Sequence, residues 1–310
     1  MAINMKGKSL ASLYDLTREE IEEIFKTSEL LKLQLLRGQE HPILKGKTLA
    51  MIFEKPSTRT RISFEVGMWQ LGGYALYLSA TDLQLGRGET IGDTARVLSR
   101  YVNGIMARVF KHQTILDLIR YSEVPVINGL SDFTHPCQGL ADLFTIYEKK
   151  GRLSGLKLAY IGDGNNVAHS LLYGCSKVGM DIVLGCPKGF EPSSKVVSDA
   201  EQVAKKNGST IKVTKDPKEA VKGADVIYTD VWASMGQEKE REKRVKVFKP
   251  YQVNGKLVKG AKEDYLFMHC LPAHRGEEVT DEVADSKNSV IFDQAENRMH
   301  VQKALMALIM

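Results

Sequence analysis

The 310-residue chain has few cysteines, at positions 137, 175, 186 and 270, and none of them forms a C-x-x-C pair. This spacing argues against a zinc ribbon or a dithiol redox motif. The N-terminal segment MAINMKGKSL lacks the apolar stretch of a signal peptide and the arginine-rich character of a transit peptide. No apolar run approaches the length of a membrane span. We therefore expect a cytoplasmic protein with reduced thiols and no membrane partner.

The sequence also lacks a stripe of basic residues interleaved with aromatics, which disfavours nucleic acid as a partner. Its net charge of +5 is mildly basic and is compatible with small anionic substrates. Hydrophobic residues make up 43% and charged residues 26%, as is usual for a globular protein. At this length the chain can form two domains, each with its own core.

Short apolar runs alternate with helical stretches along most of the chain, which predicts parallel sheets covered by helices. About four runs precede a polar break at 148–152 and about five follow it. The runs are TLAMIF (48–53), ALYLSA (75–80), GIMARVF (104–110), VPVING (124–129), LKLAYIGDG (156–164), DIVLGCP (181–187), DVIYTDVW (225–232), YLFMHCLP (265–272) and SVIFD (289–293).

The predicted fold class is α/β, with two doubly wound domains. We place the first domain at 1–150 and the second at 151–292, and we expect residues 293–310 to form a helix that packs back on the first domain. A capping box at Thr17–Glu20 predicts a long helix that ends near Gly38. Two polar, glycine-containing segments, 81–90 and 233–249, have the composition of mobile loops.

The segment 54–65, EKPSTRTRISFE, lies between a buried strand and a predicted helix. The helix is indicated by apolar residues at i, i+4 and i+7, namely Ile62, Val66 and Trp69. A helix N-terminus presents free N–H groups, to which Ser57 and Thr60 add hydroxyl donors and Arg59 a planar fork. Open α/β sheets bind ligands at such strand ends, so the turn is a candidate phosphate site. The alternative is a capped helix with solvated arginines.

Two further strand ends in the same half carry polar groups. Arg108 ends the run GIMAR, and His135 and Gln138 stand in HPCQ at the start of a helix. These side chains can donate hydrogen bonds to a carbonyl or an amide. The alternatives are a surface salt bridge for Arg108 and a helix cap for His135. Three strand ends could thus converge on one ligand.

Six separated motifs carry a family resemblance over essentially the whole chain. They are STRT (57–60), Arg108, HPCQ (135–138), DVWASMG (230–236), HCLP (269–272) and AENR (295–298). Together they resemble the aspartate/ornithine carbamoyltransferase family, and the last three resemble its ornithine branch. The resemblance implies two α/β domains and a homotrimer, or a larger assembly of trimers. It also implies the reaction of carbamoyl phosphate with L-ornithine to give L-citrulline and phosphate.

The resemblance also implies site residues. Arg108, His135 and Cys270 would be catalytic. The carbamoyl-phosphate site would comprise Ser57, Thr58, Arg59, Thr60, Gln84, Arg108, His135, Pro136, Cys137, Gln138, Cys270, Leu271 and Arg298, with Gln84 reaching a neighbouring subunit's site. The ornithine site would comprise Leu130, Asn166, Asp230, Ser234 and Met235.

The residue types suit this chemistry. Attack on the carbamoyl carbon builds negative charge on its oxygen, which Arg108, His135 and the Thr60 hydroxyl can stabilise. Asp230 can orient the incoming ammonium, and phosphate can leave while bound at the turn. Neither a metal nor an organic cofactor is required. His269, Cys270 and His274 form only a weak metal pattern without a fourth ligand, and the alternative for Cys270 is a buried structural thiol.

Other functions remain to be weighed. Gly162-Asp163-Gly164 resembles the start of a dinucleotide-binding loop, but Val167 occupies the position of the third glycine. A sister transferase acting on aspartate would need extra cations, and one acting on putrescine would lack the S-M-G element at 234–236. A non-catalytic protein on the same scaffold is disfavoured because the expected catalytic positions are all occupied.

Overall fold

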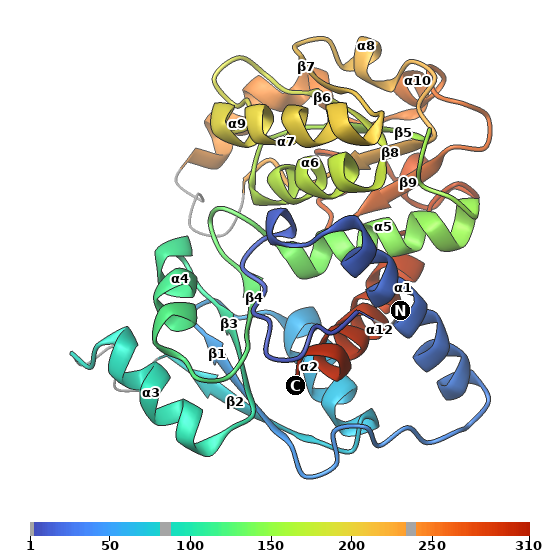
Figure 1. The fold of residues 1–310 in the computed structure, drawn as a ribbon. Helices are drawn as coiled ribbons and strands as arrows, with labels where there is room; N and C mark the ends of the chain where they lie inside the picture. Colours follow the sequence, from blue (N-terminus) through green and yellow to red (C-terminus); the bar gives the residue numbers. More distant parts are fainter. Residues whose placement is uncertain (1–2, 81–87, 234–239) are drawn as a thin grey trace. The chain divides into compact units, whose positions relative to one another are not determined.

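The computed structural model describes residues 3–80, 88–233 and 240–310. The chain divides into two compact units (Figure 1). Unit 1 comprises Met1–Ala141 and Glu296–Met310, and unit 2 comprises Asp142–Ala295. The substrate-binding domains predicted at 1–150 and 151–292 remain a prediction, because the units are defined by packing and not by ligands.

The sheet of unit 1 is parallel and has the strand order β2-β1-β3-β4. Its strands are β1 (Thr48–Phe53), β2 (Tyr74–Ser79), β3 (Gly104–Arg108) and β4 (Val126–Leu130). The inner strands β1 and β3 are almost entirely buried, which is why they read as unbroken apolar runs. Its helices are α1 (Arg18–Leu36), α2 (Thr58–Gln70), α3 (Ile91–Tyr101) and α4 (His112–Tyr121), with a short 3-10 helix, η1, at Leu13–Asp15.

Two long helices pass from one unit to the other, α5 (Pro136–Lys150) and α12 (Ile291–Ile309). In unit 1, α12 lies beside α2 (Figure 1). The two helices approach closely at Gly67, where an added Cβ would lie 3.1 Å from both Lys303 Cγ and Met306 Cε. Residues 296–310 therefore pack with the first unit, as the sequence predicts for the C-terminal helix.

The capping residues set the start of α1, but the face of α2 that is buried differs from the one predicted. Thr17 and Glu20 form the predicted capping box, and α1 ends at Leu36. In α2, however, the spaced residues Ile62 and Trp69 are 52% and 76% exposed in the single chain. The buried face is instead formed by the smaller and polar side chains of the helix together with Phe64 and Met68. The apolar spacing indicates the helix correctly but marks a surface that this chain does not cover itself.

The sheet of unit 2 is also parallel, in the order β7-β6-β5-β8-β9. Its strands are β5 (Lys157–Ile161), β6 (Asp181–Gly185), β7 (Ile211–Thr214), β8 (Val226–Thr229) and β9 (Leu266–His269). Its other helices are α6 (Asn166–Val178), α7 (Ser194–Asn207), α8 (Pro217–Val221), α9 (Arg241–Phe248), α10 (Gly255–Val258) and α11 (Asp281–Ala284), with the 3-10 helix η4 at Lys249–Tyr251.

One strand prediction in the second half is wrong. The run SVIFD (289–293) is not a strand: Ser289 makes an isolated bridge to Phe267, and α12 begins at Ile291. The fifth strand is β7, an edge strand paired only with β6. Its sequence IKVT is short and half-exposed, so it lacks the unbroken apolar run by which the inner strands are recognised.

The loop predicted at 233–249 also needs correction. Residues 241–248 form the helix α9, and Arg244 within it is buried. Its Nη1 donates to Asp163 Oδ2 and to the carbonyl oxygen of Trp232, each at 2.8 Å. Its guanidinium also lies 4.8 Å from the ring centre of Phe190. Residues 234–239, and residues 81–87 of the other predicted loop, lie outside the described part of the chain.

Replacing Arg244 with methionine is expected to lower the free energy of unfolding by about 3 kcal/mol, because the buried Asp163 carboxylate would lose its guanidinium partner. Burial already raises the pKa of Asp163, while Arg244 opposes that rise. Without the arginine the pKa rises further, so the deficit should shrink as the pH is lowered and the carboxyl becomes neutral. Urea denaturation at several pH values measures this. The control is Arg241→Met on the same helix, because Arg241 forms an exposed pair with Glu277. Equal losses in both variants would contradict the prediction.

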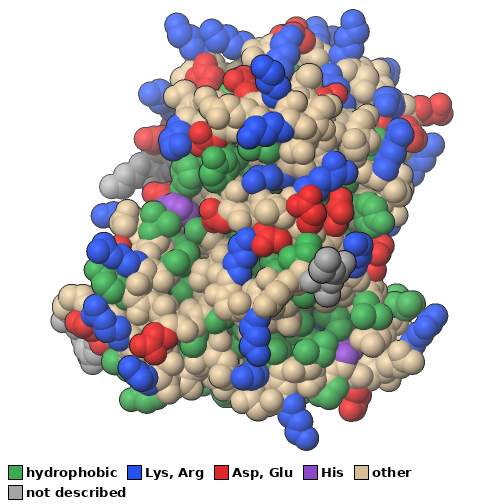
Figure 2. Space-filling view, viewed as in Figure 1, with side chains coloured by type: hydrophobic (Ala, Val, Ile, Leu, Met, Phe, Trp, Pro, Cys, Tyr) green, Lys and Arg blue, Asp and Glu red, His purple; other side chains and the backbone are tan. Residues whose placement is uncertain are grey.

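The fold class predicted from the sequence is confirmed, since both units are parallel sheets covered by helices. Within the described ranges no helix is long and apolar enough to cross a membrane. On the face that Figure 2 shows, basic and acidic side chains are interspersed. No broad stripe of lysine and arginine crosses the described part of that face.

Candidate active site

The strand order of unit 1 places the candidate phosphate turn at a topological switch point. From β1 the chain adds β2 on one side and β3 on the other, and open α/β sheets bind ligands where this reversal occurs. The turn that carries Ser57 follows β1, and Arg108 is the last residue of β3. Phe53 pairs in register with Arg108, and the Glu54 amide donates to the Arg108 carbonyl at 2.9 Å. The turn and Arg108 therefore belong to one edge of the sheet.

The turn itself is the N-terminus of α2, with Ser57 as its cap. The Ser57 hydroxyl accepts from the Thr60 amide at 3.3 Å and donates to the Thr60 hydroxyl at 3.1 Å. The two arginines of the turn differ. Arg61 is exposed, donates to Glu65 at 3.0 Å and lies 4.1 Å from the ring centre of Tyr77. Arg59 is close enough to His135 to lower the pKa of its imidazole.

A buried arginine of the C-terminal helix joins this turn to the start of α5. Arg298, on α12, donates from Nη1 to Gln138 Oε1 at 2.6 Å and from Nη2 to Thr60 Oγ1 at 3.3 Å. His135 immediately precedes α5, which begins at Pro136. Burial, and then the charges of Arg298, Arg108 and Arg59, hold the pKa of His135 well below its usual value. The imidazole is therefore neutral at neutral pH.

The other described residues predicted for the carbamoyl-phosphate site in the first half are Thr58, Pro136 and Cys137. Thr58 is the first residue of α2 and is exposed, and Pro136 is buried at the start of α5. The thiol of Cys137 is buried and donates to the Asn128 carbonyl oxygen at 3.5 Å, and burial raises its pKa to about 12. A contact of Cys137 with a ligand would therefore come from its backbone.

Unit 2 has its own switch point, between β5 and β8. The turn after β5 carries Asn165, which caps α6, and Asp230 directly follows β8. Asn165 Nδ2 donates to Asp230 Oδ2 at 2.8 Å, which ties the two strand ends together. Asn166, predicted for the ornithine site, is the first residue of α6. Asp230 is itself buried, so its carboxylate orientation is fixed by protein groups.

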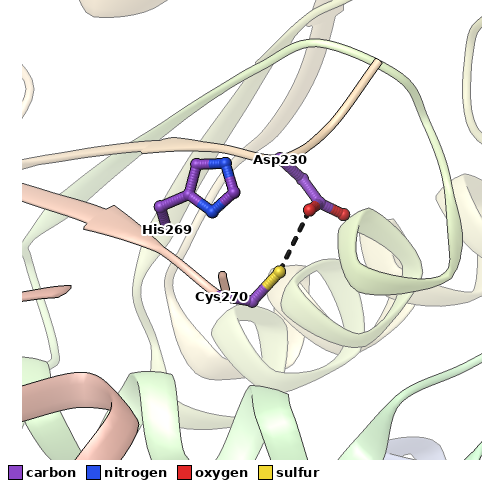
Figure 3. A group of neighbouring side chains, drawn as sticks. All are labelled: Asp230, His269 and Cys270. Carbon is purple, nitrogen blue, oxygen red and sulfur yellow. Dashed lines mark hydrogen bonds between the residues drawn. The ribbon is translucent and has the colours of Figure 1, made fainter. Parts of the chain in front are cut away.

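Cys270 meets Asp230 because β8 and β9 are adjacent parallel strands. Thr229 and His269 pair in register, so the next residue of each strand emerges at the same edge. The Cys270 thiol points toward the carboxylate and donates to Asp230 Oδ1 at 3.0 Å (Figure 3). Cys270 is also partly exposed, unlike the other three cysteines, which are buried. The pair is thus a carboxylate and a thiol presented together at a strand edge.

The neighbouring His269 supports the loop after β9. Its Nδ1 accepts from the Leu271 amide at 2.9 Å, so its Nε2 carries the proton and donates to the buried Glu278 at 3.2 Å. Leu271 has a φ of +60°, which a residue with a side chain rarely adopts. The bond from its amide to His269 helps to hold this strained backbone in place.

Among the described residues of unit 2, two groups of side chains have the atom types of metal ligands. One consists of Asp230, His269 and Cys270, whose ligand atoms lie within 4.8 Å of one another. Both ring nitrogens of His269 are already engaged, so the imidazole offers no lone pair to an ion in this conformation. The other group is His274, Glu277 and Glu278. Its Glu277 is paired with Arg241, and its Glu278 with His269.

Several predictions remain untested by these contacts. Gln84, Ser234 and Met235 lie outside the described residues. Leu130 ends β4 in unit 1, whereas Cys270 and Leu271 belong to unit 2. The substrate contacts predicted for these three residues therefore stay predictions.

Comparison with known proteins identifies the family. Residues 8–148 match the model of the aspartate/ornithine carbamoyltransferase carbamoyl-P binding domain, and residues 154–309 match that of the Asp/Orn binding domain. The chain belongs to the aspartate/ornithine carbamoyltransferase family. It is 65% identical over 310 residues to an ornithine carbamoyltransferase of Thermococcus kodakarensis, covering 100% of this chain and 98% of that protein. An ornithine carbamoyltransferase of Bacillus subtilis is 57% identical over 307 residues, covering 99% and 95%.

Solved structures of this family show the same fold. The ornithine carbamoyltransferase structure from Pyrococcus furiosus has a TM-score of 0.97 and 62% identity, and the match covers 99% of this chain and 98% of that one. The structure from Gloeobacter violaceus has a TM-score of 0.88 at 44% identity, covering 99% and 100%.

Two residues of the candidate site were missed by reasoning from the sequence. Asn165 holds Asp230, and its signal was its position as a helix cap directly after Gly162-Asp163-Gly164. Glu278 holds His269, nine residues earlier in the chain. No local pattern marks a glutamate that becomes fully buried against the end of the preceding strand.

Proposed function

We propose that this protein transfers the carbamoyl group of carbamoyl phosphate to the side-chain amine of L-ornithine, giving L-citrulline and phosphate. The observation that carries the proposal is the chemistry of the two switch points. Unit 1 presents hydroxyls, a helix N-terminus and arginines, which suit a phosphate dianion. Unit 2 presents Asp230 with Cys270, which suit a cationic amine.

The groups of unit 1 fit the changes in charge during the reaction. The amine nitrogen attacks the carbamoyl carbon, the new C–N bond forms, and the bond from that carbon to the phosphate oxygen breaks. Arg108, His135 and Thr60 stabilise the negative charge on the carbamoyl oxygen. A neutral His135 serves as a hydrogen-bond donor and not as a proton source. The proton lost by the amine leaves with the departing phosphate.

Ornithine is favoured over other acceptors by the groups at unit 2. Aspartate would bring a second carboxylate toward Asp230, and like charges at close range repel. Putrescine lacks the α-amino and α-carboxyl groups that Asn166, Ser234 and Met235 are proposed to bind. A homotrimer, or a larger assembly of trimers, and a cytoplasmic location are proposed on the family resemblance and on the N-terminal sequence.

An acceptor assay tests the proposal. Purified protein with carbamoyl phosphate should form citrulline from L-ornithine and little product from aspartate or putrescine, followed by colour reaction and chromatography. Faster product formation from putrescine or aspartate would show that ornithine is not the preferred acceptor. No product with any amine, while carbamoyl phosphate still binds, would make the protein a binding protein on this scaffold.

The pH dependence of the reaction should reflect the amine and not His135. The ornithine side-chain amine has a free pKa near ~10.4, so kcat/KM for ornithine should rise through the neutral range as the reactive neutral form becomes more abundant. Since the pKa of His135 lies well below its usual value, its titration should not appear near pH 6.5. Initial rates between pH 6 and 9 measure this. A plateau that begins near pH 6.5 would show instead that an imidazole controls the rate.

A further inference from the structure

Arg298 and Gln302 lie one turn apart on the buried face of α12. Arg298 is 3% exposed and Gln302 is fully buried. The surroundings of Gln302 fix the orientation of its amide, because only one orientation matches donors with acceptors. In that orientation its oxygen accepts from Arg298 Nε at 3.2 Å and Nη2 at 3.1 Å, and its nitrogen donates to Ser63 Oγ at 2.5 Å.

Ser63 connects Gln302 to the phosphate turn by hydrogen bonds. Its hydroxyl donates to the Thr60 carbonyl oxygen at 3.1 Å, which leaves the oxygen lone pairs to accept from Gln302. Thr60 in turn accepts from both Ser57 and Arg298 through its own hydroxyl. The first turn of α2 and the guanidinium are therefore held by one chain of hydrogen bonds. Every donor and acceptor in that chain belongs to unit 1.

The chemical type of residue 302 matters as much as its position. A glutamate there could form a two-pronged ion pair with the Nε edge of Arg298 and would offset its charge. Glutamine holds the same edge with a neutral carbonyl. The charge of Arg298 reaches the site, because it is the first of three arginine charges that depress the pKa of His135.

We propose that Gln302, seated on Ser63, is a positioning residue that fixes the Arg298 guanidinium for carbamoyl phosphate without adding a negative charge beside it. This inference rests on the function proposed above. Gln302 touches no substrate in this role and acts through Arg298 and the turn at Ser57–Thr60. The site therefore requires that the side chain accepting hydrogen bonds from Arg298 Nε be uncharged.

The test compares Gln302→Leu and Gln302→Glu with Asn297→Leu. Asn297 is an equally buried amide on the same helix, and it accepts from Lys32 on α1. Inorganic phosphate, titrated by calorimetry, is the binding probe, and initial rates give KM for both substrates. Gln302→Leu should weaken phosphate binding and raise KM for carbamoyl phosphate by about 5- to 10-fold, with KM for ornithine within about twofold. Gln302→Glu should weaken phosphate binding more than leucine does, by on the order of tenfold or more.

A second readout separates positioning from general destabilisation. Gln302→Glu should raise the pKa of His135, measured by NMR of labelled histidine, because the added carboxylate opposes the arginine charges. Asn297→Leu should lose stability on heating but keep wild-type phosphate affinity. If both Gln302 variants bind phosphate as Asn297→Leu does, the positioning role is wrong. If the wild type binds phosphate but forms no citrulline, the proposed function fails while the phosphate titrations still decide the role of Gln302.

Discussion

Asp230→Asn is expected to lower kcat/KM for L-ornithine by on the order of 100-fold, with the dissociation constant of carbamoyl phosphate within about twofold. The carboxylate accepts from Asn165 Nδ2, from the Val231 amide and from the Cys270 thiol, so its orientation is already set. An asparagine would place an N–H group against one of these donors. It would also remove the negative charge that attracts the substrate ammonium. Steady-state kinetics at saturating carbamoyl phosphate give kcat/KM for ornithine, and calorimetry of carbamoyl phosphate gives its dissociation constant.

The matched control for this prediction is Asp225→Asn, at the other end of the same strand. Asp225 is also buried, and it accepts from the Lys157 amide at 2.9 Å and from Lys262 Nζ at 2.7 Å. Its replacement should reduce stability without changing KM for ornithine. Equal kinetic losses in the two variants would mean that Asp230 matters only for folding of the β8 region. A loss of phosphate affinity in Asp230→Asn would indicate that the carboxylate supports carbamoyl-phosphate binding, which contradicts its assignment to ornithine.

The strands of this fold could be predicted from the sequence where they form apolar runs, and such runs are clearest where burial is nearly complete. The inner strands β1, β3, β5, β6 and β8 lie between covering helices, so their sequences are nearly unbroken apolar runs. An edge strand has no such requirement, and β7 was missed for that reason. The run SVIFD fulfils the apolar criterion equally well, but a helix begins within it at Ile291, and Val290 and Ile291 are buried while Phe292 is 70% exposed. Burial alone does not distinguish the two conformations.

In the candidate site, too, some contacts could be predicted from the sequence and others could not. The turn at 57–60 and Arg108 could be predicted to meet, because the carboxyl ends of neighbouring parallel strands share an edge. Contacts that a helix makes with residues far away in the sequence could not be predicted in this way. Arg244 is one charge among many in a polar run, yet it is buried and donates to Asp163, whereas its described neighbours at 241–243 are exposed. Its orientation depends on the pocket formed by Trp232, Phe190 and Phe248, which no local pattern encodes.

Arg59→Ala is expected to raise the dissociation constant of carbamoyl phosphate at least about tenfold, whereas Arg61→Ala should change it by less than about twofold. The two arginines stand two residues apart in the same turn and differ in where they point. Arg61 is engaged on the surface with Glu65 and Tyr77. Arg59 lies near His135 and can complete a charge-assisted contact with the phosphate.

The decisive measurement is calorimetry of carbamoyl phosphate and of inorganic phosphate with both variants under the same conditions. Arg59→Ala should also raise the pKa of His135, because one of the three cations that depress it is gone. Arg61→Ala should leave that pKa unchanged. Equal weakening by the two substitutions would indicate general attraction by a basic surface, and the affinity loss would then fall steeply as salt is added. A loss confined to Arg59 and resistant to salt requires a partly desolvated contact, which is the contact that a phosphate seated on the N-terminus of α2 would make.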